Sequence, residues 1–213
     1  MKKNKKQGMP VTYEKALFDR GFSYICGVDE VGRGPWAGPI VAAATIVSNL
    51  KSQISNLGVR DSKKLSEKKR EDIFEIVKDI KDIEYFVAFI SAEEIDKIGL
   101  GRANQLVLKK AVDGLSQKPD YVLVDGFEIG GLTTRQEKVV GGDSKIFSIA
   151  LASIIAKVSR DRYMKELAKK YPEYGFEHHK GYGTAKHLGA IKKYGICPEH
   201  RKSFHPIHDI IVQ

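Results

Sequence analysis

The chain has 213 residues, of which 42% are hydrophobic and 30% are charged, a balance that is typical of a folded globular protein and excludes a disordered or fibrous one. Its 36 lysine and arginine residues exceed its 27 aspartate and glutamate residues, and the formal net charge of +9 favours an anionic partner such as nucleic acid, although composition alone leaves a basic surface without such a partner equally open. The two cysteines, Cys26 and Cys197, lie far apart and outside any C-x-x-C pattern, which excludes a disulfide framework and favours the cytoplasm.

The first predicted elements are a leader, a helix and two strands. Residues 1–6 are basic, but no continuous apolar run follows them, so we expect a disordered leader rather than a signal peptide. The apolar spacing of residues 11–21 predicts a short amphipathic helix. Residues 24–28 and 39–47 are predicted strands, and the longer run is too short to cross a bilayer.

The link between these two strands combines carboxylates with glycines. Asp29 and Glu30 follow the first strand directly, and Gly32, Arg33 and Gly34 come next. Glycines let backbone amides approach a ligand closely, and a cation beside two carboxylates suits metal-assisted chemistry on phosphate. Neighbouring residues of a regular strand face opposite sides of the sheet, so we predict a break at Glu30 that lets both carboxylates reach one site.

Three helices and a strand are expected next. Ser66 is a predicted N-cap for a helix with apolar positions between residues 73 and 80, and residues 83–90 form a third predicted strand. Residues 91–94 match a capping box that opens a helix ended by Gly99 or Gly101. Residues 102–117 carry the apolar spacing of another helix.

A fourth predicted strand, residues 121–125, ends in Asp125. Because a helix precedes it, we expect a crossover that places it parallel to an earlier strand. Residues 130–136 are predicted as a turn, and Asp143 follows shortly after an apolar pair. From residue 148 we expect a long helix that begins buried, becomes strongly charged by Arg160 and ends in solvent.

The C-terminal part is rich in glycine, histidine, proline and aromatic residues from residue 171 onward. A last helix is predicted between Thr184, its N-cap, and Gly195. The histidines crowd this part, but without partnering cysteines or a recognised ligand spacing a zinc site is disfavoured. These histidines are His178, His179, His187, His200, His205 and His208.

Several acidic residues share one context, because each follows an apolar segment and precedes glycine or a turn. They are Asp29, Glu30, Asp125 and Asp143. If the strands share direction, these carboxylates meet at one edge of the sheet. Clustered negative charges repel unless divalent cations neutralise them, and oxygen ligands select Mg²⁺ or Mn²⁺. Any one such aspartate is better explained as a turn former, but four in matching contexts favour a metal site.

With these motifs the chain resembles the ribonuclease HII family, the type 2 ribonucleases H. The matching segments occur in the family's order and cover nearly the whole chain. They are residues 29–35 with 37–39, 61–65, 124–126, 142–144, 152–158 with 160–161, 179–182 and 201–204. The departures are Val31, where alanine is commoner, and Leu151, where a small residue is usual.

The resemblance implies an α/β fold with a mixed five-stranded ribonuclease H-like sheet flanked by helices. We expect a basic leader and short helix at 1–20, a catalytic domain at 21–170, and a helical C-terminal extension at 171–213 that contributes to substrate binding. The implied activity is cleavage of RNA in RNA–DNA hybrids and at single ribonucleotides in duplex DNA, 5′ to the ribonucleotide, leaving 3′-hydroxyl and 5′-phosphate ends. The expected protein is a cytoplasmic monomer that acts in ribonucleotide excision repair, with these nucleic acids and no membrane as partners.

The resemblance also implies roles for individual residues. The four acidic residues named above resemble the catalytic ligands of two Mg²⁺ or Mn²⁺ ions that bind with the substrate. Gly32, Arg33 and Gly34 resemble a loop that senses the ribose 2′-hydroxyl through its backbone, which glycine makes accessible. Tyr182 resembles a tyrosine that senses the RNA-to-DNA junction, whereas its residue type alone favours a packing role.

Three lysines could contact the phosphate backbone of a nucleic acid, and two other classes of nucleic-acid protein are also compatible with the sequence. Lys63, Lys64 and Lys180 are candidates for such contacts, with a solvated lysine face as the alternative. A basic nucleic-acid-binding module would bind without turnover, and another ribonuclease H-like nuclease, such as a junction resolvase, would ignore the 2′-hydroxyl. Ser-His-Asp hydrolysis is disfavoured, because no Gly-x-Ser-x-Gly elbow is present.

Overall fold

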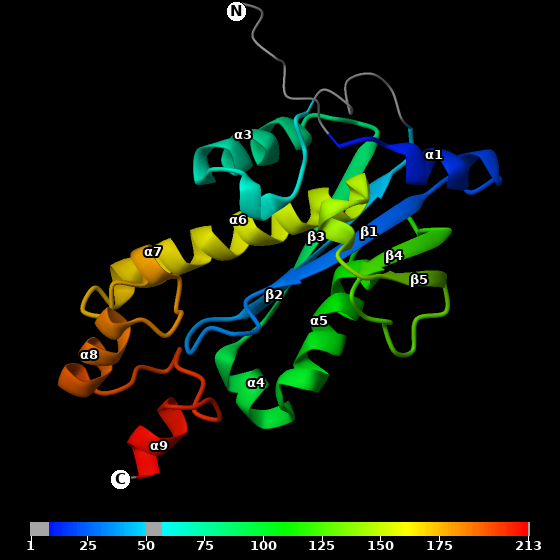
Figure 1. Ribbon diagram of the computed structural model, residues 1–213. Helices are drawn as coiled ribbons and strands as arrows, with labels where there is room; N and C mark the ends of the chain where they lie inside the picture. The colour runs from blue at the N-terminus through cyan, green and yellow to red at the C-terminus, as the bar shows by residue number, and fades with distance from the viewer. Residues whose placement is uncertain (1–8, 50–56, 213) are drawn as a thin grey trace, which may run out of the picture.

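A five-stranded mixed sheet forms the centre of the protein in the computed structural model, which describes residues 9–49 and 57–212 (Figure 1). The strand order is β3-β2-β1-β4-β5. The strands are β1 (Ile25–Val31), β2 (Ile40–Val47), β3 (Ile83–Ile90), β4 (Tyr121–Asp125) and β5 (Arg135–Val139). The predicted fold class is confirmed, whereas the predicted leader at residues 1–6 lies outside the described residues.

Strand direction divides the sheet into an antiparallel and a parallel part. The β1–β2 pair, joined by a short loop, and the β2–β3 pair, joined by the segment that contains α3, are both antiparallel. A helical crossover precedes β4, which pairs with β1 in parallel, with Val28 opposite Val124. The predicted crossover is therefore confirmed, and β5 extends the parallel part of the sheet beside β4.

Helices surround this sheet, and their bounds follow the chain. They are α1 (Thr12–Asp19), the 3-10 turn η1 (Ser62–Lys64), α3 (Glu67–Val77), α4 (Ala92–Ile98), α5 (Leu100–Asp113), the 3-10 turn η2 (Gly142–Ser144), α6 (Phe147–Lys170), α7 (Phe176–His179), α8 (Ala185–Tyr194) and α9 (Ile207–Val212). Within residues 9–49 and 57–212, no helix is both long and apolar enough to cross a membrane.

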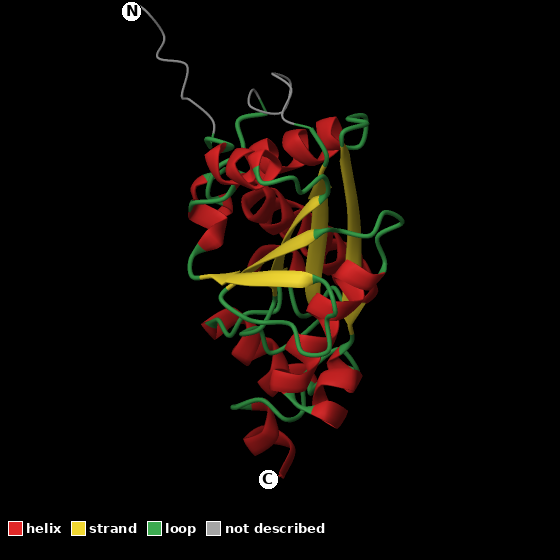
Figure 2. Ribbon diagram, turned by 90° about the vertical axis from the view of Figure 1, so that its right-hand side faces the viewer, coloured by secondary structure: helices red, strands yellow, loops and turns green. Residues whose placement is uncertain are grey.

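The helices cover both faces of the sheet, as Figure 2 shows with the strands lying between helices. On one face α6 and α3 pack on β2 through a buried cluster that includes Ala43, Val47 and Ile155. On the other face α5 packs on β1 through Val28 and Val107. Because both faces of β2 are covered, all its residues are buried, which explains its continuous apolar run.

Gly27 sets the close approach of α6 to β1. A Cβ atom at this position would lie 2.2 Å from the Ser148 carbonyl carbon and 2.4 Å from the Ile149 nitrogen. Only glycine lets the first turn of α6 rest against the strand at this distance. The same turn is tied to α1, where Glu14 accepts a hydrogen bond from the Ser148 amide at 2.7 Å.

The predicted helix caps are confirmed, whereas the helix predicted from residue 102 begins earlier, at Leu100. Ser66 caps α3 by accepting a hydrogen bond from the Lys69 amide, and Ser91 and Glu94 form the predicted capping box at the start of α4. Thr184 caps α8 in the same way. The helix predicted to continue to residue 117 ends earlier, at Asp113, because Gly114 follows and carries no side chain to extend the packed face.

The prediction of a turn at residues 130–136 is wrong at its end, because Arg135 and Gln136 already belong to β5. This strand has the sequence RQEKV and is partly or fully exposed along its length, as an edge strand is. Its polar residues carry no apolar alternation to identify a strand. Glu137 anchors it instead, accepting hydrogen bonds from the hydroxyl groups of Tyr13 and Tyr121.

The prediction that the helix α6 begins buried and ends in solvent is confirmed, since Lys169 and Lys170 are exposed, but its charged part is still buried at residues 160 and 161. Arg160 is fully buried and Asp161 is 3% exposed. The Arg160 guanidinium donates to the carbonyl oxygens of Pro39, Ala37 and Lys180 at 3.0, 3.2 and 2.9 Å. A buried charge is tolerated when its donors are satisfied in this way, so residue type alone does not reveal that this side chain is buried.

The chain after residue 171 folds against one end of the sheet, where Figure 1 shows α7 and α8 beside the end of α6. Backbone hydrogen bonds join it to the loop between β1 and β2, from the Trp36 amide to the Gly181 carbonyl at 2.8 Å and from the Arg201 amide to the Trp36 carbonyl at 2.7 Å. The clustered histidines have a packing role here. His179 stacks on His187 with ring centroids 4.4 Å apart, and His187 also contacts His200.

Candidate active site

A cavity of about 320 Å³ lies where β1 extends past the end of β4. It brings together all the predicted carboxylates, together with the predicted Lys63 and Tyr182. The lining residues are Asp29, Glu30, Val31, Ser62, Lys63, Arg70, Asp125, Asp143, Ser153, Lys157 and Tyr182. Residues from six separate parts of the chain therefore meet at one edge of the sheet, where strand ends of an open α/β sheet commonly form a site.

The predicted break at Glu30 is wrong. Pairing with β2 continues regularly across Glu30, opposite Ala42, and ends with Val31 opposite Val41. Pairing with β4, in contrast, stops at Val28. Beyond Val28 no described strand pairs with β1 on its β4 side, so we infer that side chains from both faces, including Asp29 and Glu30, reach the open edge without a break.

Asp29 is buried, at 7% exposure. Its Oδ1 accepts a hydrogen bond from the Glu30 amide at 2.8 Å. Burial, and then the neighbouring negative charge of Glu30, raise the pKa of Asp29 well above its usual range, while a hydrogen bond from Ser153 lowers it in part. The free protein therefore holds this carboxyl in an environment that penalises its charge.

Glu30 has one partly paired oxygen and one unpaired oxygen. Its Oε1 lies 3.7 Å from Arg33 Nη1, while Oε2 is buried and has no hydrogen-bond partner. Burial raises the pKa of Glu30 to about 7, with Arg33 acting against this shift and Asp125 adding to it. A buried carboxylate oxygen without a partner is unfavourable unless a cation or proton completes its surroundings.

Asp125 and Asp143 reach the cavity from a strand end and a 3-10 turn. Asp125 Oδ1 accepts a hydrogen bond from the Gly142 amide at 2.8 Å, which joins the end of β4 to η2. Burial raises the pKa of Asp125, an effect that the Gly142 hydrogen bond partly offsets. Asp143, placed in η2, is 5% exposed and pairs with Lys63 Nζ at 3.0 Å, a contact that raises the pKa of Lys63.

These carboxylates suit divalent cations. The donor set consists of oxygens, which Mg²⁺ and Mn²⁺ prefer, and the unpartnered Glu30 Oε2 leaves a ligand position open. Within the described residues no group of three or more histidine, cysteine, aspartate or glutamate side chains is already arranged to hold a metal ion. An ion would therefore have to draw the carboxylates closer together.

The glycine loop lies beside the carboxylates. Gly32 has φ of +92°, and a Cβ there would lie 2.3 Å from Arg160 Nε, so both conformation and space require glycine. The Arg33 guanidinium carbon is 4.7 Å from the Phe127 ring centroid. Gly34 faces Tyr182, since a Cβ at Gly34 would be 3.9 Å from Tyr182 Cε1.

Tyr182 and Lys180 are placed differently. Tyr182 is 43% exposed and lines the cavity, so its ring is open to a ligand. Lys180 is 9% exposed, has φ of +51°, and donates from Nζ to the Glu177 carbonyl at 2.6 Å. The structure therefore does not bring Lys180 into the cavity lining, and its phosphate contact stays a prediction. Lys64 pairs with Asp61 at 3.3 Å.

Sequence reasoning assigned no role to four further polar residues that line the cavity, Ser62, Arg70, Ser153 and Lys157. Ser153 and Lys157 lie four residues apart on α6, which places them on one face of that helix. Ser153 Oγ is 2.9 Å from Ser62 Oγ, and the Arg70 guanidinium donates to the Ser62 carbonyl at 3.0 Å. The helical spacing of Ser153 and Lys157 was the available signal.

Comparisons with known proteins agree on one family. The family model described as Ribonuclease HII matches residues 26–208. A ribonuclease HII from Endomicrobium trichonymphae is 50% identical over 203 residues, covering 95% of both chains, and one from Caldicellulosiruptor bescii is 52% identical over 192 residues, covering 90% of this chain and 91% of that protein. The crystal structure of ribonuclease H2 from Pyrococcus horikoshii OT3 is similar with a TM-score of 0.75 and 29% identity, covering 88% of this chain and 96% of that one.

Proposed function

Because the chain belongs to the ribonuclease HII family, we propose that it cuts single ribonucleotides embedded in duplex DNA as well as the RNA of RNA–DNA hybrids. As a type 2 ribonuclease H it is a nuclease of the hydrolase class that acts on RNA–DNA hybrids. The cut is 5′ to the ribonucleotide and leaves 3′-hydroxyl and 5′-phosphate ends. The observation that carries the proposal is the convergence of four carboxylates in one cavity.

In this proposal Asp29, Glu30, Asp125 and Asp143 bind two Mg²⁺ or Mn²⁺ ions together with the substrate. When bound, such ions activate a water and stabilise the leaving oxygen of a phosphodiester. Two observations support this assignment. The pKa values of Asp29 and Asp125 are raised, and one Glu30 oxygen is buried without a partner, so a cation bound among these carboxylates would stabilise their charged forms.

Other residues position the nucleic acid. Lys63, whose ammonium group lies beside Asp143, is placed to contact a phosphate next to the cut. The Gly32–Arg33–Gly34 loop reads the 2′-hydroxyl through backbone groups, and Tyr182 contacts the sugar that follows. We assign residues 21–170 to the catalytic domain and residues 171–213 to an extension that supplies Tyr182.

The test is cleavage of a DNA duplex that carries one ribonucleotide, in Mg²⁺ and in Mn²⁺. We expect one incision 5′ to the ribonucleotide, with end groups identified by phosphatase treatment and ligation. Asp125→Asn and Asp29→Asn should abolish cleavage but leave the thermal melting temperature and duplex binding close to those of the wild type. Asp113→Asn is the matched control, because Asp113 is a surface residue of α5 that pairs with Lys109.

Two results would contradict this assignment. Binding of the duplex without any turnover in either metal would indicate a nucleic-acid-binding module with structural carboxylates. Cleavage that is equally fast on a duplex without the ribonucleotide would indicate a nuclease that does not read the 2′-hydroxyl.

A further inference from the structure

Arg201 is a buried arginine that lies outside the residues assigned to catalysis and substrate binding. Its side chain is fully buried, yet it is far in sequence from the glycine loop that it contacts. Nη1 donates to the Arg33 carbonyl at 3.0 Å, Nη2 to the Gly32 and Gly38 carbonyls at 2.6 and 2.8 Å, and Nε to the Gly38 carbonyl at 3.0 Å. One planar guanidinium therefore binds both ends of the loop between β1 and β2.

These contacts fix the direction of two consecutive peptide groups. The bonds from Gly32 to Arg33 and from Arg33 to Gly34 are trans, so the N–H of each peptide group points opposite to its carbonyl. Because both carbonyls point at Arg201, the amides of Arg33 and Gly34 both point away from it. Two successive amides facing one way form a donor pair for an oxygen ligand.

The donor pair faces the cavity side of the loop. Gly34 lies beside the Tyr182 ring, as the 3.9 Å approach of a Cβ at Gly34 shows, and Tyr182 lines the cavity with the carboxylates. Arg201 thus lies behind the loop, while the sugar-reading surface of the proposed function lies in front of it. Arg201 does not line the cavity.

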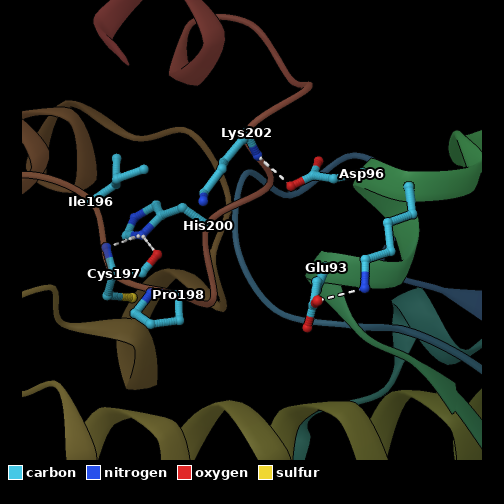
Figure 3. Close-up of a pocket in the computed structure, with 8 residues that line it drawn as sticks. Glu93, Asp96, Ile196, Cys197, Pro198, His200 and Lys202 are labelled. Atoms are coloured by element: carbon cyan, nitrogen blue, oxygen red, sulfur yellow. Dashed lines mark hydrogen bonds and ion pairs between the residues drawn. The ribbon is translucent and has the colours of Figure 1, made fainter.

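Asp96, on α4, anchors the backbone that follows Arg201, and Figure 3 shows its contact with Lys202. Its carboxylate accepts hydrogen bonds from the Lys202 amide at 2.8 Å, the Ser203 amide at 3.0 Å and the Ser203 hydroxyl at 2.6 Å. These contacts border a cavity of about 550 Å³ between α4 and the C-terminal segment. Asp96 therefore holds the segment that carries Arg201 to the catalytic domain.

The guanidinium is costly to bury and is retained with its charge. Burial, and then the nearby Arg160 guanidinium, lower the pKa of Arg201 to about 9, so it remains protonated at neutral pH. Its side-chain hydrogen bonds go to carbonyl oxygens of the loop, and Arg201 forms no ion pair with a carboxylate within the described residues. An apolar residue of similar volume could be buried at lower cost, but it could not bind the loop carbonyls and fix their direction.

We propose that Arg201 is a positioning residue for ribonucleotide recognition: it holds the Gly32–Gly34 loop so that the Arg33 and Gly34 amides face the substrate sugar. This role rests on the proposed function. Arg201 touches neither substrate nor reacting atoms and acts through the loop, with Asp96 holding Arg201 in place.

The test compares Arg201→Met, Arg201→Lys and the wild type on a duplex with one ribonucleotide, well below the lowest melting temperature. We expect kcat to fall at least about tenfold in Arg201→Met while KM changes less than about threefold, because the bulk of duplex binding comes from phosphate contacts elsewhere. Arg201→Lys should recover part of kcat, since one ammonium reaches only some of the carbonyls. Arg102→Met, an exposed arginine on α5, is the control and should match the wild type.

The positioning role would be overturned if Arg201→Met folds and retains the wild-type kcat, whether its KM is unchanged or raised. If Arg201→Met does not fold, Asp96→Ala decides, because it loosens the anchor without burying a new group: a fall in kcat of about threefold supports the role and an unchanged kcat overturns it. A wild-type protein that does not cleave the duplex overturns the proposed function, and this inference with it.

Discussion

Replacing Glu30 with glutamine should stabilise the metal-free protein while abolishing cleavage. Glu30 is held in a cavity with three other carboxylates, and its Oε2 is buried without a partner. Burial raises the pKa of Glu30 to about 7 in the folded protein, against 4.5 for the ordinary group. The folded state therefore binds this proton more tightly than the unfolded state, and stability falls as the pH rises from 4.5 to 7.

The size of the effect follows from that difference. A pKa of about 7 instead of 4.5 corresponds to at most about 3 kcal/mol of stability lost above pH 7. The glutamine amide would itself need a hydrogen-bond partner, which removes about 1 kcal/mol of the gain. The expected net gain is about 2 kcal/mol, or about 4–8 °C in melting temperature for a chain of this length.

The assay is thermal unfolding in EDTA at pH 8 and at pH 4.5, followed by circular dichroism. We expect Glu30→Gln to melt above the wild type at pH 8, with the difference largely lost at pH 4.5, where the wild-type carboxyl is protonated. Mg²⁺ should raise the melting temperature of the wild type more than that of the variant. Equal melting temperatures at pH 8, or a gain that is the same at both pH values, would refute the electrostatic reasoning.

Further predictions concern packing, protonation and binding. Gly27→Ala should cost about 3 kcal/mol or more in urea unfolding, because a Cβ would lie 2.2 Å from the backbone of α6; a cost below 1 kcal/mol would show that the helix shifts easily. Burial lowers the pKa values of His187 and His200 to about 4, so the free energy of unfolding should fall as the pH drops from 6.5 towards 4. The loss should be on the order of 2 kcal/mol after allowance for coupling and solvent screening, and His187→Gln should flatten this pH dependence. Lys63→Met should lower the salt dependence of duplex affinity by about one released ion if Lys63 contacts phosphate, whereas an unchanged slope would leave Lys63 only its contact with Asp143.

The elements that sequence predicts well are those whose signals are local. The strand predicted at residues 83–90 is observed as Ile83–Ile90, and the caps at Ser66 and Thr184 are observed as predicted. Each depends on a few neighbouring residues, such as a side chain that accepts from an amide three positions on. The apolar runs of β2 and β4 are equally readable, because burial on both faces requires them.

The elements that sequence predicts poorly depend on distant partners. The charge of Arg160 gives no sign of burial, yet its side chain is buried against carbonyls of the loop before β2 and of Lys180, which adjoin it only after folding. The residues of β5 form a strand by pairing with β4, and Glu137 is held by two tyrosines from other elements. The break at Glu30 was predicted from one strand alone, whereas the open edge arises because pairing with β4 stops earlier than pairing with β2.

The site shows the same division. The acidic residues that line the cavity were identified from their local context, and the structure brings them together because parallel pairing aligns the ends of β1 and β4. Ser153 and Lys157 were missed, since a serine and a lysine in a helix are common and only their position against the strand end brings them to the cavity. Their placement required the packing of α6 on β1, which depends on Gly27.

Two consecutive residues of the C-terminal segment hold the two elements assigned to sugar recognition. The Cys197 amide donates to His200 Nδ1 at 2.9 Å, which places the His200 proton on Nε2, 3.1 Å from His187 Nε2. His187 then carries its proton on Nδ1 and donates to the Tyr182 carbonyl at 3.0 Å.

This chain of hydrogen bonds requires both histidines to be neutral, which agrees with their lowered pKa values. Arg201, the next residue, holds the Gly32–Gly34 loop instead. Successive residues of an extended segment face opposite sides, and His200 pairs with Ala37 of the loop in an antiparallel bridge. A displacement of this segment would therefore move Tyr182 and the glycine loop together, so the spacing between the two sugar-reading elements depends on one short backbone segment.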